Sequence, residues 1–202
     1  MTAKLIRRED VDLFPEEMIE NKVVSGDLSA QQAEDVEIKD SELKDVFLSN
    51  GSFPRCSLVK TKIVKADLSN TELDEVFIKD VNIENSRLTG SLFTNGFIQR
   101  SQIKNSKCEL ACFRSSRIKN VIWENCLLKE ADLQGTELKN VTFRNCDLRS
   151  VDLSQSSFNN VDLRGSEIKG AAIELANFNQ TIVDTAQAIY LASVTGLTVE
   201  DL

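Results

Sequence analysis

Large apolar residues recur at every fifth position over most of the chain. From Leu28 to Val183 this position holds leucine, isoleucine or phenylalanine, except at Ala33, Cys108, Trp123 and Val183, and it is never polar or charged. Two residues earlier comes a small side chain or valine in nearly every pentad. A period of five fits neither an α-helix, with 3.6 residues per turn, nor a β-strand, which alternates every second residue. The pattern therefore predicts a repeat architecture with the pentad as its unit.

A second and longer period is visible at the last position of the pentad. Asparagine recurs there in every fourth pentad, in the series Asn85, Asn105, Asn125 and Asn145 and in the series Asn120, Asn140 and Asn160. Asparagine tolerates a left-handed backbone and hydrogen-bonds locally, so it suits a tight corner. A corner that returns with every fourth pentad means that four pentads make one turn of a square coil. Stacked asparagine side chains are expected to hydrogen-bond along the stack.

The two inward positions of each pentad predict an all-β solenoid. A single coil buries nothing alone, but stacked coils form a continuous core. Residues 26–185 contain enough pentads for about eight coils, which at ~4.8 Å per coil give a rod of roughly 38 Å. The register does not slip within this segment, so we expect one domain without internal loops.

Several pentads carry a recognisable signature. The segments "ADLSN", "ADLQG", "CDLRS", "VDLSQ" and "VDLRG" resemble the A(D/N)LXX repeat of the pentapeptide-repeat family. The resemblance covers residues 26–185 and implies a right-handed quadrilateral β-helix. The C-terminal segment is similar to that of the quinolone- and albicidin-resistance branch of this family. The mechanism proposed for that branch is that the rod binds a type II topoisomerase in place of DNA.

The two ends depart from the repeat. Residues 1–25 are interpreted as an N-terminal cap, and residues 186–202 as a C-terminal cap with a helix and a short strand over residues 197–199. Asp184 and Gln187 form a capping-box pattern at the start of this helix. The resemblance implies a homodimer through the helix, and a simple cap is the alternative. The candidate dimer contacts are Ile189, Tyr190, Val194 and Leu197.

Composition narrows the function further. The chain has no histidine, which removes the commonest general base and metal ligand, and it has no P-loop or nucleophile-elbow motif. We therefore expect no enzyme, no metal and no cofactor. The five cysteines are interpreted as free thiols in the cytoplasm, with Cys112 facing outward. A net charge of -8 argues against direct nucleic-acid binding, and no apolar run is long enough to span a membrane.

Sorting the pentads by fours places many carboxylates on one side of the rod, which we call the acidic face. Its acidic residues are Glu34, Asp35, Glu72, Asp74, Glu75, Asp132, Asp152 and Glu174. Only Arg55 and Arg114 oppose them, which leaves a net charge of -6 on this face. A DNA duplex of about 38 Å carries about 22 charges, so the face is a sparse imitation of DNA. A solvated acidic surface that keeps the protein soluble is the alternative interpretation.

The neighbouring side of the rod, called the aromatic face, carries outward apolar residues and a net charge of about +3 by the same sorting. Val59, Phe77 and Phe97, here called the aromatic patch, are candidate contacts unless the N-terminal segment covers them. Two functions follow. One is a non-enzymatic binder of DNA gyrase or topoisomerase IV linked to antibiotic resistance. The alternative is a protein-binding scaffold without any nucleic-acid connection.

Overall fold

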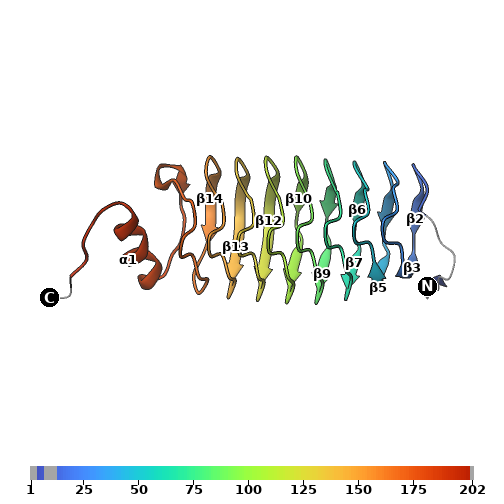
Figure 1. Cartoon of the computed structure of the whole chain (residues 1–202), viewed down its shortest axis with the longest axis horizontal. Coiled ribbons are helices and arrows are strands. Elements are labelled where there is room, and N and C mark those ends of the chain that lie inside the picture. The colour runs from blue at the N-terminus through green and yellow to red at the C-terminus, as the bar shows by residue number, and fades with distance from the viewer. Residues whose placement is uncertain (1–3, 7–12, 201–202) are drawn as a thin grey trace.

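The chain folds as a parallel β-solenoid of about eight turns followed by a single short helix (Figure 1). The computed structural model describes residues 4–6 and 13–200. Strands pair in parallel with the strand one coil further along, and from Glu37 onward each paired residue meets the residue four pentads later. This arrangement confirms the β-helix class predicted from the two sequence periods.

The strands form two columns along the rod. The first column contains β2 (Met18–Glu20), β4 (Glu37–Lys39), β6 (Ser57–Val59), β8 (Phe77–Lys79) and β10 (Phe97–Gln99). The second contains β1 (Lys4–Ile6), β3 (Lys22–Asp27), β5 (Glu42–Phe47), β7 (Lys62–Val64), β9 (Asn82–Glu84) and β11 (Gln102–Lys104). Both columns continue in β12 (Arg117–Glu124), β13 (Glu137–Arg144) and β14 (Ser157–Asp162), and β15 (Phe178–Asn179) pairs with β14. The first column is the aromatic face.

The other two sides of the coil are held by single parallel bridges between adjacent turns. The acidic face is one of them, and its bridges join Gln32, Ser52, Glu72, Leu92, Cys112, Asp132, Asp152 and Ala172 in that order. Backbone amides on this side donate to carbonyls of the next coil, as Leu133 does to Asp152 at 2.8 Å. The stacking order predicted for the acidic face is therefore confirmed.

The corners explain why the pentad has a fixed last position. Every fifth residue from Ala30 to Gly170 has a positive φ, the left-handed conformation that asparagine and glycine tolerate best. The predicted asparagine ladders form at these corners. Asn140 Nδ2 donates to Asn120 Oδ1 at 2.9 Å, and Asn160 Nδ2 donates to Asn140 Oδ1 at 3.0 Å. The corner side chains thus tie successive coils together.

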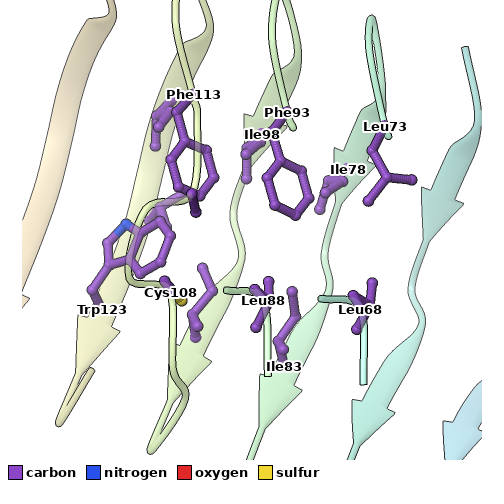
Figure 2. Packing of buried hydrophobic residues seen from close by; sticks show 14 of the residues in the cluster. Leu68, Leu73, Ile78, Ile83, Leu88, Phe93, Ile98, Cys108, Phe113 and Trp123 are labelled. Atoms are coloured by element: carbon purple, nitrogen blue, oxygen red, sulfur yellow. The ribbon is translucent and has the colours of Figure 1, made fainter. Parts of the chain in front are cut away.

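The centre of the coil is filled by the large residues of the repeat, layer upon layer (Figure 2). Trp123 lies fully inside, edge-on to Phe113 at 5.4 Å and stacked on Phe143 at 6.2 Å between ring centroids. The coil that contains this tryptophan also contains Cys108, the smallest central residue after Ala33. Pairing the largest central residue with a small one within a coil keeps the interior at ordinary packing density.

The N-terminal segment already belongs to the stack in part. Strand β2 pairs with β4, and β3 pairs with β5. Ile19 pairs with Ile38, so the paired residues here are 19 positions apart instead of 20. The regular spacing begins after a register shift between Val24 and Gly26. The boundary expected at residue 26 therefore marks a register shift and not the first strand of the coil. That residues 1–25 act as a cap stays a prediction, and residues 1–3 and 7–12 lie outside the described part.

The C-terminal coil ends under α1 (Thr185–Val194), which follows the 3-10 turn η1 (Leu175–Asn177). The predicted capping box is present, since Gln187 N donates to Asp184 Oδ1 at 3.0 Å and Asp184 N donates to Gln187 Oε1 at 3.0 Å. The short strand expected over residues 197–199 does not form. No parallel coil follows the last turn in the described part of the chain, so these residues have no ladder to join.

Candidate interaction surfaces

The acidic face brings its predicted carboxylates together on one side of the rod, but two arginines remove part of the charge. Arg55 binds Asp35 through two hydrogen bonds of 2.9 and 2.8 Å and also contacts Glu34. Its guanidinium holds the pKa of the Asp35 carboxyl below its ordinary value. Arg114 pairs with Asp132 at 2.5 Å. Each of these exposed arginines therefore cancels one negative charge of the face.

The row of carboxylates on the acidic face is interrupted in its middle. Glu72 and Asp132 lie three coils apart in the row, and the positions between them are Leu92 and Cys112. Leu92 is 38% exposed. The two central pentads of the face contain no carboxylate, so the charge divides into two groups about 14 Å apart.

The densest negative charge on the face is the acidic cluster, which consists of Glu72, Asp74 and Glu75. Glu72 accepts a hydrogen bond from Ser52 Oγ at 2.8 Å. Asp74 accepts from the Thr94 hydroxyl and from Asn95 Nδ2, the latter at 3.2 Å. No lysine or arginine of the described residues lies within ion-pair distance of the three. Their charges therefore remain uncompensated, and uncharged donors hold two of them in place.

The second group on the acidic face is smaller and partly structural. Asp152 accepts hydrogen bonds from the amide and hydroxyl of Ser154, at 2.9 and 2.6 Å. Glu174 accepts from Gln155 N at 3.2 Å and from Asn177 Nδ2 at 3.1 Å. In earlier coils the amide equivalent to that of Gln155 donates to a backbone carbonyl of the next turn. The Glu174 side chain thus completes the hydrogen bonding at the end of the stack.

The aromatic patch is a compact feature of the neighbouring face. Phe77 and Phe97 pair in register on β8 and β10, and their rings stack with centroids 5.7 Å apart and planes inclined by 14°. Both rings and Val59 are half-buried. Strand β1 pairs with β3 in the other column, so the described part of the N-terminal segment does not cover the patch.

The thiols give little reason to expect chemistry. Cys56, Cys108, Cys126 and Cys146 are buried, and Cys112 is half-buried on the acidic face. Burial raises the pKa of the Cys56 thiol to about 11 and that of Cys108 well above its ordinary range. No group of three or more metal-ligating side chains gathers within residues 4–6 and 13–200. In the same described residues, no helix is long and apolar enough to cross a membrane.

The candidate dimer residues fall into two kinds. Ile189, Val194 and Leu197 are exposed at 48%, 56% and 64%. Tyr190 instead turns toward the coil, where its hydroxyl accepts a hydrogen bond from Gly170 N at 2.6 Å. The exposed residues leave an apolar surface at this end of the rod, and that they contact a second copy stays a prediction.

Sequence reasoning missed a set of side chains that substitute for a further coil. Gln187 is buried, and its Nε2 donates to Leu163 O at 2.5 Å and to Ser166 O at 2.7 Å. Asp184 Oδ2 accepts from Gly165 N at 2.9 Å. Groups of the following turn make the equivalent contacts in earlier coils. The capping-box signal located Asp184 and Gln187 but did not indicate this second use.

Known proteins that resemble this chain share its solenoid architecture. Residues 98–173 match the model of the pentapeptide repeat region. Residues 98–173 are therefore similar to a pentapeptide repeat region, and the solenoid has the fold of pentapeptide-repeat β-helix structures. No protein of curated function is similar enough in sequence to count as a match.

Two solved structures share the fold over nearly the whole chain. Both are trypsin-treated variants of QnrB1, a plasmid-mediated fluoroquinolone resistance protein. The first is 14% identical in sequence with a TM-score of 0.60, and the match covers 94% of this chain and 100% of the QnrB1 chain. The second is 18% identical in sequence with a TM-score of 0.57, and the match covers 98% of this chain and 96% of the QnrB1 chain. At these identities the likeness establishes the fold.

Proposed function

We propose that this chain is a non-enzymatic cytoplasmic interaction protein that binds a type II topoisomerase, DNA gyrase or topoisomerase IV, in place of DNA. The acidic cluster on a flat side of an uninterrupted solenoid is the observation that carries the proposal. Three uncompensated carboxylates within one pentad present a dense negative charge to a positively charged DNA-binding groove. The fold shared with a fluoroquinolone resistance protein supports the choice of partner.

The divided acidic face shapes the proposal. Two charge groups about 14 Å apart, with Leu92 and Cys112 between them, cannot reproduce the even charge of a duplex. The expected contact is therefore local. The acidic cluster makes the electrostatic contact, while the apolar middle of the face contributes buried area. Binding should weaken with salt, but less steeply than DNA binding to the same enzyme.

The test is a gyrase supercoiling assay with purified protein, with and without a fluoroquinolone. We expect inhibition at low micromolar protein or rescue from the drug. Reversing the acidic cluster (Glu72→Lys, Asp74→Lys, Glu75→Lys) should remove the effect, because the charge that meets the enzyme changes sign. A supercoiling reaction that is unaffected by the unaltered protein would reject the proposal.

A matched control separates the acidic cluster from net charge. The triple variant Glu42→Lys, Asp45→Lys, Glu109→Lys changes the net charge by the same amount on the other sides of the rod. It should leave the effect on gyrase within about twofold, since screened charges on another face contribute little. Equal loss in both triple variants would mean that only the total charge matters.

The proposal includes a homodimer through the exposed apolar surface of α1. Val194→Asp should convert the dimer to a monomer, because it places a charge in an apolar contact. Light scattering after size exclusion gives the mass directly. Thr185→Asp, which adds the same charge at the favourable N-terminus of α1, should leave the dimer intact. A monomeric unaltered protein would contradict this part of the proposal.

A further inference from the structure

A second surface lies around the corner from the acidic cluster, on the aromatic face. In its row along the rod, Ser57, Phe77, Phe97 and Arg117 follow one another in register. The repeat usually has a polar side chain at this outward position, so phenylalanine in two successive coils, at Phe77 and Phe97, is an exception. Their rings stack on each other and remain half-exposed. The result is an apolar ridge on an otherwise polar flat side.

Positive charge flanks this ridge on the side away from the acidic face. A second row lies two residues further along each of these strands. From coil to coil it contains Val59, Lys79, Gln99, Lys119 and Lys139. Lys119 and Arg117 share one carboxylate, that of Glu137, at 2.9 and 3.9 Å. Within the part of the chain that the structure describes, no carboxylate lies within ion-pair distance of the Lys79 or Lys139 ammonium. The cations beside the ridge are therefore only partly compensated.

We propose that the aromatic patch docks an acidic protein segment that carries an apolar side chain. Stacked rings present their edges to solvent, and a ring edge carries the positive end of the aromatic quadrupole. Carboxylates of the segment would contact these edges together with Lys79 and Arg117, and its apolar side chain would cover the ridge. Charge complementarity with a locally positive surface on a chain of net charge -8 favours this occupant.

A nucleic acid fits the same surface less well. Bases bind aromatic side chains through the ring faces. Here each ring offers one face to the other ring, at 14° between planes, and the residues in register on either side are Ser57 and Arg117.

This inference goes beyond the proposed topoisomerase contact and does not depend on it. The two surfaces use different sides of the coil and opposite charges. Loss of one contact by substitution on its own face should leave the other unchanged. A protein with both surfaces could bring an acidic partner to an enzyme held on the acidic face.

The test uses a fluorescent synthetic nonapeptide of glutamate and aspartate with one central phenylalanine. Fluorescence anisotropy with the full chain should show saturable binding that weakens with salt. Replacing the peptide's phenylalanine with serine should weaken binding at least fivefold. Phe77→Ser and, separately, Lys79→Glu should each weaken binding about tenfold. Ile122→Ser, which removes an exposed apolar residue elsewhere on the rod, should leave binding unchanged.

Each remaining outcome would overturn the inference. These are no binding of the acidic peptide, equal loss in Ile122→Ser and Phe77→Ser, or tighter binding of a twelve-nucleotide oligothymidylate that Phe77→Ser abolishes. Thermal melting confirms that each variant is folded before it is used. Lys79→Glu changes an outward residue, so it keeps the test valid if Phe77→Ser is destabilised.

Discussion

Replacing Leu133 with aspartate is expected to unfold the coils around it. Leu133 is completely buried, and it lies in the stack of central residues between Phe113 and Leu153. The substitution removes a packed side chain and places a carboxylate where no partner can reach it. We expect a loss of at least about 4 kcal/mol. A domain of this size has roughly 5–15 kcal/mol in total, so little stability remains.

The adjacent position provides the control for Leu133→Asp. Gln134 points outward, and its side chain makes only a long contact of 3.4 Å with Ser154 Oγ. Gln134→Glu adds the same charge one residue away and should change stability by less than about 0.5 kcal/mol. Thermal melting followed by circular dichroism measures both variants, and fluorescence of Trp123 reports on the neighbouring coil. Similar melting temperatures for both variants would refute the inward and outward assignment of the pentad.

Replacing Gln187 with alanine is expected to release the C-terminal helix from the coil. The Gln187 side chain donates to two buried carbonyls and accepts from Asp184 N, so alanine loses three hydrogen bonds at once. The Leu163 carbonyl keeps the Ser166 amide as a donor, but the Ser166 carbonyl loses its side-chain donor. We expect a loss of about 3 kcal/mol, because each lost bond costs about 1 kcal/mol and a buried acceptor without a donor costs more.

Urea unfolding measures the loss in Gln187→Ala, and amide exchange locates it. Exchange should become faster in α1 and in the last coil, while the middle of the rod stays protected. Gln134→Ala, which removes an outward glutamine, should have little effect on either measurement. An equal loss of stability in the two alanine variants would contradict the closing role of Gln187.

A nearly isosteric substitution separates the two roles of Gln187. Gln187→Glu keeps an oxygen for Asp184 N, as capping boxes often do, but it loses the Nε2 donor. The new carboxylate would face two carbonyls in a buried site, which raises its folded-state pKa above the unfolded value of about 4.3. An acid with a raised folded-state pKa destabilises the fold above its unfolded pKa, and the penalty shrinks as pH falls. Stability of Gln187→Glu relative to the unaltered protein should therefore improve between pH 7 and pH 5. A constant difference over this range would contradict the burial of this side chain against carbonyls.

The cap shows where sequence reasoning stops. The signals around Asp184 and Gln187 located the start of α1, because a capping box depends on residues three positions apart. The contacts of Gln187 with Leu163 and Ser166 instead reach back to the preceding coil. They depend on the angle at which the helix leaves the coil, and no local pattern encodes that angle. The same limit hid the first coil, whose partners are one position closer in sequence than those of the later coils.

The sequence predicted which carboxylates share the acidic face, but it did not predict which of their charges are neutralised by arginines. Stacking of every fourth pentad placed its carboxylates on one side, and the structure confirms that order. Arg114, however, reaches across to Asp132 on the next coil. A long side chain can choose among several carboxylates on neighbouring coils, so its partner depends on rotamers. Only the structure therefore isolates the acidic cluster as the uncompensated group.

The sequence by itself determined the solenoid, its register from residue 26 onward, its inward residues and its left-handed corners. Each of these follows from a strict repeat, in which every pentad meets the same environment one coil later. The tertiary structure decided what the repeat cannot specify. This includes how the last coil is closed, how the first coil joins out of register and which surface charges neutralise each other. These features depend on contacts at the ends of the stack or between side chains with several reachable partners, where the periodic pattern carries no information.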